Sequence, residues 1–287
     1  MSESTLRLAV QKEGRLSDKS LAFVEACGIS YSRNKTKLKN PASNFPIEIL
    51  YLRDDDIPTC VADGAADIGI VGENVVIEKK REVTLVERMG FSKCRLSLAI
   101  PQHMEWKGLE SLRDKKIATS YPNLLQSYLD EQGIYAEIHE ISGSVEIAPS
   151  IGLADGICDI VSSGATLFSN GLKEVQPIFY SEAVMIATPG LSPAKQAILD
   201  KLLFRIRAVI RAESYKYILM NIPNESISKV QALIPGMKSP TITPLALPGW
   251  SSLHSVLKED TFWEVIDTLQ EAGAQGILVI PIEKMIM

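Results

Sequence analysis

A short run of small and hydroxyl-bearing residues, SSGATL at positions 162–167, has the composition of a phosphate-binding loop. It follows an apolar stretch at 157–161 that predicts a buried strand, and a helix is expected after it. Small side chains let backbone N–H groups approach an anion, and the positive end of a following helix adds attraction. An ordinary strand-to-helix turn is the alternative, because Ser-Gly turns are common. The residues expected to contact a terminal phosphate monoester are Ser162, Ser163, Gly164, Ala165, Thr166 and Leu167.

Acidic residues flank this loop on its N-terminal side. Asp159 ends the predicted strand, where its carboxylate can bind ribose hydroxyls or face positive charge that develops on a sugar carbon during substitution. A helix cap or turn stabiliser is the alternative for Asp159. Glu146 and Asp155 bound a segment that we predict to be helical, with Pro149 in its first turn. Glu146 is placed to assist Asp159, whereas Asp155 is expected to be solvated.

A second group of candidates lies near the N-terminus, after an apolar run at 6–10 that predicts the first strand. Gly14, Arg15 and Leu16 form a turn there, with Lys12 close by, and a guanidinium at such a place can pair with phosphate or stack on a base. A solvated surface charge is the alternative for both cations. Further candidates for the same cleft are Asp67, Gly69 and Tyr121, although packing in a core or hinge accounts equally well for Tyr121.

Apolar runs alternate with helical patterns through the first two thirds of the chain, and this order predicts an α/β fold with a largely parallel, helix-covered sheet. The expected strands cover 6–10, 47–52, 68–72, 116–120, 136–141 and 157–161. The expected helices cover 17–26, with Ser17 as N-cap, 123–132, 146–155 and 191–212.

An internal echo predicts two related lobes. The pattern ADGxxDIxxxG occurs at 62–72 and again at 154–164. If both copies form the same turn and strand, each lobe presents a glycine-ended strand to a shared cleft, where open α/β sheets bind ligands. Two unrelated helix-to-strand turns are the alternative, since Asp-Gly is common in turns.

The last part of the chain has a different order of elements. Strands are expected at 217–221, 241–247, 251–257 and 276–280, with helices at 226–233 and 261–272. The order β-α-β-β-α-β is the ferredoxin-like pattern. No catalytic residues are evident in it, so a small-molecule sensor or an oligomerisation module is expected.

Length and charge narrow the functional class. A chain of 287 residues is too long for one ordinary core and indicates two or three compact units. The net charge of −5 indicates no broad basic surface, so nucleic acid is not an expected partner. The sequence shows no membrane-span pattern and no signal peptide, so we expect no membrane partner and a cytoplasmic location. The four cysteines form no zinc-binding pattern and are expected to be reduced.

Several of these segments resemble the ATP phosphoribosyltransferases. The family signature matches Glu146, Gly152, Ala154, Ile157, Asp159, Ser163, Gly164, Thr166 and Leu167. Nearly the whole chain is similar to that family. The other matching segments are QKxGRL at 11–16, RDDDIP at 53–58, GIVGEN at 69–74, CRLS at 94–97, TSYP at 119–122, NGL at 170–172 and IPIEKM at 280–285.

The resemblance implies a reaction and a site. Adenine N1 of ATP attacks C1 of phosphoribosyl pyrophosphate, and pyrophosphate leaves with Mg²⁺, which is the first step of histidine biosynthesis. Asp159 is the expected catalytic carboxylate, and Glu146, Asp159 and the 162–167 loop are expected to bind phosphoribosyl pyrophosphate. The metal ligands are not assigned. The residues expected at ATP are Lys12, Gly14, Arg15, Leu16, Asp67, Gly69 and Tyr121.

The resemblance is to the long form of the family, and this implies an architecture as well. We expect two periplasmic-binding-protein-like α/β lobes around a cleft and a C-terminal ferredoxin-like regulatory domain. Lobe I would cover 1–100 with a return segment at about 178–211, lobe II 101–177, and the regulatory domain 212–287. Histidine would inhibit by binding near 233–247, AMP would also inhibit, and dimers and hexamers are expected.

Two other classes of protein remain open from the residues alone. Hinged α/β lobes with a sensor domain also describe a non-catalytic binding protein. An amino-acid-regulated enzyme of another pathway, such as a dehydratase, would carry a similar C-terminal domain. The 162–167 loop favours a phosphorylated substrate over both.

Overall fold

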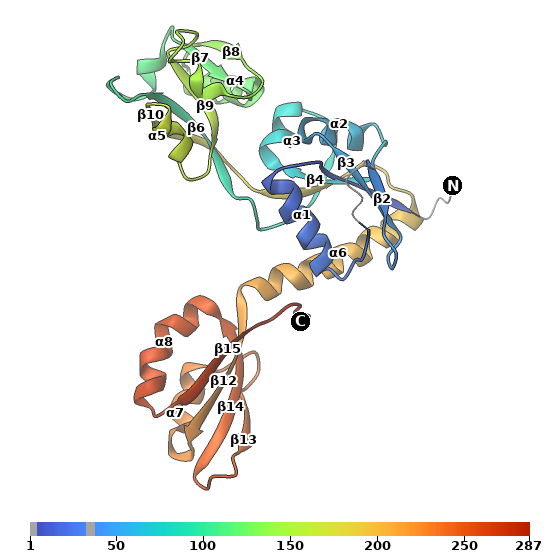
Figure 1. Cartoon of the computed structure of the whole chain (residues 1–287), viewed down its shortest axis with the longest axis vertical. Helices are drawn as coiled ribbons and strands as arrows, with labels where there is room; N and C mark the ends of the chain where they lie inside the picture. The colour runs from blue at the N-terminus through green and yellow to red at the C-terminus, as the bar shows by residue number, and fades with distance from the viewer. Residues whose placement is uncertain (1–4, 33–37) are drawn as a thin grey trace. The chain divides into compact units, whose positions relative to one another are not determined.

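The computed structural model describes residues 5–32 and 38–287, and the chain divides after Asp200 into two compact units. The first unit contains two α/β lobes, drawn in blue to cyan and in green to yellow in Figure 1. The second unit is a smaller α/β domain, drawn in orange to red. In the described part of the chain, no helix has the length and apolar character of a membrane span.

Lobe I is built on a sheet in which six described strands have the order β2-β3-β1-β4-β11-β5. Alternating residues of β1 (Leu6, Leu8 and Val10) are fully buried, and each such side chain contributes about 2 kcal/mol to folding. The strands are β1 (Leu6–Gln11), β2 (Lys39–Pro41), β3 (Ile47–Leu52), β4 (Ile68–Gly72), β5 (Thr84–Arg88) and β11 (Ala183–Ala187). The helices are α1 (Arg15–Ala26), α2 (Ile57–Ala62) and α3 (Glu73–Lys79), and α6 (Pro193–Glu213) begins in this unit.

Lobe II has five described strands in the order β10-β6-β9-β7-β8. Its core combines Leu96, Leu98 and Ile117 of the sheet with Leu125 and Leu129 of the covering helix. The strands are β6 (Cys94–Pro101), β7 (Lys116–Thr119), β8 (Glu137–Glu140), β9 (Gly156–Val161) and β10 (Leu172–Ser181). The helices are α4 (Pro122–Gln132) and α5 (Ala165–Ser169).

Both sheets are mixed, so the prediction of a largely parallel sheet is wrong. In lobe I, β3, β1 and β4 run parallel, but β11 is antiparallel to both β4 and β5. In lobe II, β8, β7 and β9 run parallel, while β6 is antiparallel to β9 and β10. Strands β11 and β6 each enter their sheet where the chain crosses between the lobes, and β2, antiparallel to β3, is a further antiparallel strand at the edge of lobe I.

These crossings also correct the expected lobe boundaries. The chain leaves lobe I after β5 and enters lobe II at β6, whose residues 94–100 had been assigned to lobe I. It returns between β10 and β11, so the return begins at about residue 182 instead of 178. No local sequence pattern marks the crossing, because the change of sheet occurs in the short loop between β5 and β6.

The two lobes share one topology, as the sequence echo predicts, but the echo is out of register with the structure. The N–H of Asp67 donates to the carbonyl of Arg7 and its carboxylate accepts the N–H of Arg7. Asp155 makes the same pair of bonds with Lys116. The structural counterpart of Asp67 is therefore Asp155, four positions earlier than Asp159, which the echo aligns with Asp67.

Two local predictions in the first unit are wrong. Ser17 is fully buried inside α1, which begins at Arg15 after Gly14, so Ser17 is not the N-cap. Residues 146–155 form a 3-10 turn at Val145–Ile147 followed by further turns, not an α-helix. Pro149 cannot donate a backbone hydrogen bond, and Gly152 adopts a positive φ of 73°, so the chain turns instead of continuing a helix.

The second unit has the predicted β-α-β-β-α-β order. Its described strands lie in the order β13-β14-β12-β15, all neighbours antiparallel. The elements are β12 (Tyr215–Pro223), α7 (Ile227–Leu233), β13 (Thr241–Pro244), β14 (Trp250–Lys258), α8 (Glu259–Glu271) and β15 (Gln275–Pro281). Its core joins Ile218, Met220 and Leu253 of the sheet with Val230 and Phe262 of the helices.

Candidate functional site

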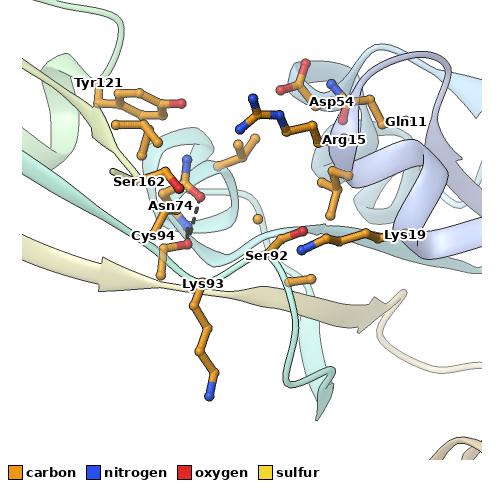
Figure 2. A pocket seen from close by; sticks show the side chains of 16 residues that line it. Gln11, Arg15, Lys19, Asp54, Asn74, Ser92, Lys93, Cys94, Tyr121 and Ser162 are labelled. Atoms are coloured by element: carbon orange, nitrogen blue, oxygen red, sulfur yellow. Dashed lines mark hydrogen bonds between the residues drawn. The ribbon is translucent and has the colours of Figure 1, made fainter. Parts of the chain in front are cut away.

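A cavity of about 340 Å³ lies within the first unit where lobe I meets lobe II. It opens at the ends of β1 and β4 in lobe I and of β9 in lobe II, the edge at which open α/β sheets bind ligands. Its lining, part of which is labelled in Figure 2, combines polar and apolar groups and carries three cations. The lining residues are Gln11, Arg15, Leu16, Lys19, Asp54, Gly72, Asn74, Val75, Ser92, Lys93, Cys94, Tyr121, Ile160, Ser162, Ser181 and Ala183.

Lobe I contributes most of the positive charge. Arg15 and Lys19 stand one turn apart on α1 and therefore share a face of that helix. Figure 2 shows Arg15 reaching from α1 into the cavity, beside Asp54 and across from Tyr121. Gly14, with a φ of 99°, supplies the turn that starts α1 there, although it does not itself line the cavity. Of the residues predicted at ATP, Arg15 and Leu16 are thus brought to the cavity by lobe I.

Lys12 lies just outside this cavity. It lines a neighbouring depression of about 230 Å³ that shares Gln11 and Asp54 with the main cavity. Its ammonium is 3.9 Å from the carboxylate of Glu13, and both side chains are exposed. Lys12 is therefore free to reach an anion that extends beyond the cavity.

The floor of the cavity is fixed by hydrogen bonds between α3 and the end of β10. The hydroxyl of Ser181 donates to the side-chain oxygen of Asn74 over 2.8 Å and accepts the backbone N–H of Asn74 over 3.1 Å. Both residues are buried. Burial raises the pKa of the neighbouring Cys94 thiol, which keeps that thiol neutral near pH 7. The part of the lining made by Asn74, Cys94 and Ser181 is therefore uncharged, and hydrogen bonds hold Asn74 and Ser181 together.

Tyr121 forms the wall contributed by lobe II. It follows β7 and precedes α4, and its side chain packs against the hydrophobic cores of both lobes. Burial, together with the charge of Asp159, raises the pKa of Tyr121, so its hydroxyl stays protonated. Tyr121 therefore both lines the cavity and packs at the lobe junction, the two roles that the sequence left open.

The 162–167 loop follows β9 and leads into α5. Ser162, Ser163, Ala165 and Thr166 are exposed, and Gly164 has a φ of 79°, a conformation that favours glycine. Ser162 lines the cavity, and its carbonyl accepts a bond from Arg95, which is itself paired with Glu174. Leu167 differs from the other loop residues because its side chain is buried in a lobe II core cluster, so only its backbone can face a ligand.

Asp159 and Glu146 lie next to this loop. Asp159 is half-buried in β9, and its Oδ1 accepts the N–H of Ile160 over 2.8 Å. Burial raises the pKa of Asp159 to about 6, the Ile160 N–H opposes this, and the nearby charge of Glu146 raises it further. The described residues place no basic partner on Asp159, so its charge is available to a cationic reaction centre.

Asp67 and Gly69 are not brought to the cavity, which corrects their prediction as ATP-binding residues. Asp67 precedes β4 at the opposite end from Gly72, and its carboxylate binds Arg7 and Lys195 over 3.0 and 2.7 Å. Burial alone would raise the pKa of Asp67, but the hydrogen bonds from Arg7 and Lys195 hold it below its usual range. A Cβ on Gly69 would lie 2.6 Å from Ile57, so Gly69 serves the packing of α2 on β4.

The family resemblance implies Mg²⁺, so its ligands would have to come from the acidic residues near the loop. Among the residues that the structure describes, no group of three or more His, Cys, Asp or Glu side chains could hold a metal ion. Mg²⁺ often binds one or two carboxylates together with substrate phosphates and water. Asp159 and Glu146 fit that arrangement, whereas a cage made only of protein ligands does not occur in the described part.

Several lining residues were missed by the sequence predictions, and some of them had a signal. Gln11 ends β1, the place where the carboxyl-edge rule puts ligands, and Lys19 follows Arg15 at helical spacing. Ser92, Lys93 and Ser181 lie where the chain crosses between the lobes, and no local pattern in the sequence indicates that crossing.

Comparison with known proteins now identifies the family. Residues 53–208 match the sequence model of the family described as ATP phosphoribosyltransferase, and residues 212–284 match its C-terminal domain. The ATP phosphoribosyltransferase of Cytophaga hutchinsonii is 61% identical, covering 99% of both chains. That of Phocaeicola vulgatus is 55% identical, covering 98% of this chain and 100% of the relative.

Solved structures agree with this. The ATP phosphoribosyl transferase (HisG:HisZ) complex from Thermotoga maritima is 30% identical with a TM-score of 0.63, covering 72% of this chain and 99% of that one. The periplasmic sulfonate-binding protein SsuA from Methylobacillus flagellatus KT is 18% identical with a TM-score of 0.50, covering 71% of this chain and 67% of that one, and this likeness shows the fold alone. With two lobes of that fold and a matching C-terminal domain, the chain belongs to the ATP phosphoribosyltransferase family, in its long form.

Proposed function

We propose that the cavity between the lobes and the adjoining 162–167 loop together form the site of the family reaction. That reaction transfers the phosphoribosyl group of phosphoribosyl pyrophosphate to N1 of ATP, the first step of histidine biosynthesis. One observation carries the assignment. The cations Arg15 and Lys19 of lobe I share a cavity with Ser162, the first residue of the exposed loop in lobe II.

The distribution of charge supports a division of roles between the lobes. Arg15 and Lys19 suit the nucleotide, because a guanidinium pairs with phosphate or stacks on a base. Lys12, in the neighbouring depression, suits the outer part of the triphosphate. Tyr121 offers an aromatic face and a protonated hydroxyl to the adenine. In lobe II, the exposed hydroxyls of Ser163 and Thr166 suit the 5′-phosphate of phosphoribosyl pyrophosphate.

The chemistry at the sugar favours a carboxylate without a fixed counter-ion. The ribosyl C1 gains positive charge as its bond to pyrophosphate lengthens, and the carboxylate of Asp159 stabilises that charge. Adenine N1 attacks with its own lone pair, so the chain needs to supply no general base. Holding two anionic substrates in line then supplies much of the rate enhancement.

Mg²⁺ belongs to this proposal as the ion that neutralises pyrophosphate when bound. Asp159 and Glu146 would hold it on the protein side, with the remaining ligands from substrate and water. The pKa of Asp159, raised to about 6, leaves its carboxylate mostly ionised above neutral pH and thus able to bind a cation.

Feedback control is assigned to the second unit. Its ferredoxin-like topology and its match to the family's C-terminal domain support a regulatory module. Histidine is the proposed inhibitor, with residues 233–247 as its neighbourhood, and AMP is a second one. The solved Thermotoga maritima relative is a complex, which supports oligomerisation, and dimers and hexamers are the states proposed for this chain. A cytoplasmic location, where ATP is available, completes the proposal.

A pyrophosphate-release assay tests the reaction and its control together. Release should require ATP, phosphoribosyl pyrophosphate and Mg²⁺, and it should fall when histidine is added. A folded protein that binds either substrate but releases no pyrophosphate would contradict the assignment. Removal of residues beyond about 212 should abolish inhibition by histidine in a truncated protein that still turns over, and inhibition that persists there would place the histidine site elsewhere.

A further inference from the structure

The buried carboxylate of Glu78 in lobe I accepts hydrogen bonds from a helix of lobe II. Glu78, near the C-terminus of α3, is 6% exposed. Its Oε1 accepts the backbone N–H of Asn123 over 3.0 Å, and its Oε2 accepts that of Leu124 over 2.9 Å. In return, the side-chain amide of Asn123 donates to the carbonyl of Glu78 over 3.1 Å. Three hydrogen bonds thus join the two lobes at one point.

These bonds complete the N-terminus of α4. The first helical residue, Pro122, has no N–H, and the N-cap residue Tyr121 makes no capping bond with its side chain. The next two N–H groups, of Asn123 and Leu124, both end on Glu78. A carboxylate at this place is favoured by the helix dipole. Lobe I therefore supplies the cap that lobe II lacks, and no basic side chain in the described ranges pairs with Glu78.

Both ends of α3 contact residues at or next to the cavity. At its far end, Asn123 and Leu124 follow the cavity residue Tyr121 with only Pro122 between. At its near end, α3 begins with Asn74, which is bonded to Ser181 where the chain crosses between the lobes. The short helix α3 thus connects the crossing to the N-terminus of α4, next to Tyr121.

We propose that Glu78 is a positioning residue that keeps the two lobes at the separation required for substrate binding. The proposal rests on the site assignment above, since it concerns ligands that contact both lobes. When only a fraction of molecules has the binding-competent arrangement, apparent affinity falls by that fraction. Loss of the cap should therefore weaken binding of both substrates, while the reacting groups themselves, and hence turnover at saturation, change little.

Glu78→Gln in the full-length protein is the direct test. The amide keeps the size of the side chain but has one accepting oxygen, and its NH₂ group faces an N–H that it cannot bind. We expect KM for ATP and for phosphoribosyl pyrophosphate to rise roughly fivefold to tenfold, with kcat within about threefold of wild type. Glu82→Gln is the matched control, because Glu82 is exposed four residues further along and its KM values should stay at wild type.

Hydrogen exchange of the 119–128 peptide provides a readout that needs no activity. Amides of Asn123 and Leu124 should exchange faster in Glu78→Gln than in wild type or in Glu82→Gln. Raised KM with faster exchange supports the proposal. Faster exchange with unchanged KM overturns it, because the cap would then be purely local. Raised KM with unchanged exchange also overturns it, because the effect would not pass through α4. Inactive wild-type protein would instead contradict the site assignment, so the two failures are distinguishable.

A second variant covers the case in which Glu78→Gln does not fold. Asn123→Ala removes the exposed side-chain amide and leaves both backbone bonds to Glu78 in place. Its KM values should rise about twofold in the same direction. A folded Asn123→Ala protein with wild-type KM would overturn the part assigned to this third bond, since the lobes would then keep their separation without it.

Discussion

The five described strands of lobe II have the same order as five of the six in lobe I, yet the strands at equivalent places carry different chemistry. In each lobe an acid before the central strand clamps the start of the first strand, Asp67 in lobe I and Asp155 in lobe II. With these two aligned, Asp159 of lobe II corresponds to Val71 of lobe I, which is fully buried. The same alignment pairs Gly72 with Ile160 and Asn74 with Ser162, and all four line the cavity.

This comparison shows which parts of the site come from the shared fold and which do not. The fold places the ends of the equivalent strands on one cavity. The cations Arg15 and Lys19 on α1, the acid Asp159 in β9 and the hydroxyl-rich loop before α5 each occur in one lobe only. A pair of related lobes thus provides two different half-sites, which suits two different anionic substrates.

The largest difference between the lobes should appear in stability. Asp67→Ala leaves Arg7 and Lys195 without their buried partner and should lower the free energy of unfolding by about 3 kcal/mol. Asp155→Ala removes a side chain that is 40% exposed and should cost less than about 1 kcal/mol. Urea unfolding followed by far-UV circular dichroism measures both. Equal losses would mean that the two clamps are energetically as well as geometrically equivalent.

The acid that is unique to lobe II should matter for turnover instead. Asp159→Asn should lower kcat about 100-fold, the range seen when one electrostatic partner of a transition state is removed. Its stability near pH 7 should be equal to or above wild type, because the buried charge is unfavourable. The exposed Asp63→Asn is the control and should keep wild-type kcat. Wild-type turnover in a folded Asp159→Asn protein would remove the proposed asymmetry between the lobes.

The pH dependence sharpens the same contrast. Burial raises the pKa of Asp159 to about 6, so kcat/KM should fall about tenfold between pH 7 and pH 5 as the carboxylate gains a proton. The folded state holds that proton more tightly than the unfolded state, so Asp159 lowers stability as pH rises from about 4 through 6. Asp67 acts oppositely, because its lowered pKa makes its contribution decline only as pH falls. If kcat/KM of Asp159→Asn still falls between pH 7 and pH 5 as in wild type, another group causes that fall.

The smallest expected effects separate the two half-sites. Arg15→Ala should raise KM for ATP about fivefold and leave KM for phosphoribosyl pyrophosphate near wild type. Thr166→Ala should raise KM for phosphoribosyl pyrophosphate about fivefold and leave KM for ATP near wild type. A fivefold change corresponds to about 1 kcal/mol. Initial rates with one substrate varied at saturation of the other measure both values. If either variant changes both KM values equally, the division of substrates between the lobes is wrong.

The elements with strong local signals could be predicted from the sequence. The β-α-β-β-α-β order of the last unit, the strands around 6–10 and 157–161 and the exposed turn at 162–166 all follow from alternating apolar residues and turn residues. Arg15, Tyr121 and Ser162 were also correctly expected to share a cavity. Tyr121 and Ser162 directly follow predicted strands, and Arg15 stands in the turn between a predicted strand and a predicted helix.

The errors have a common physical origin in long-range pairing. The sequence echo aligned Asp67 with Asp159, but strand register is set by which backbone groups pair, and that pairing equates Asp67 with Asp155. The crossings between the lobes likewise carry no local pattern, so the residues contributed there, such as Ser92 and Ser181, could not be placed. The sequence around Glu78 gives no sign of its role, because that role depends on the packing of α4 against α3.

The two crossings have a consequence for synthesis on the ribosome. Lobe II is one continuous stretch of chain whose two ends meet, because Cys94 pairs with Ser181 across β6 and β10. Lobe I, in contrast, lacks a central strand until β11 has been made, since β11 lies between β4 and β5. The strands of lobe I made first therefore keep one sheet edge unpaired until lobe II has been synthesised and β11 follows it. Strand β1 is therefore made before any strand of lobe II but belongs to the lobe that is finished last.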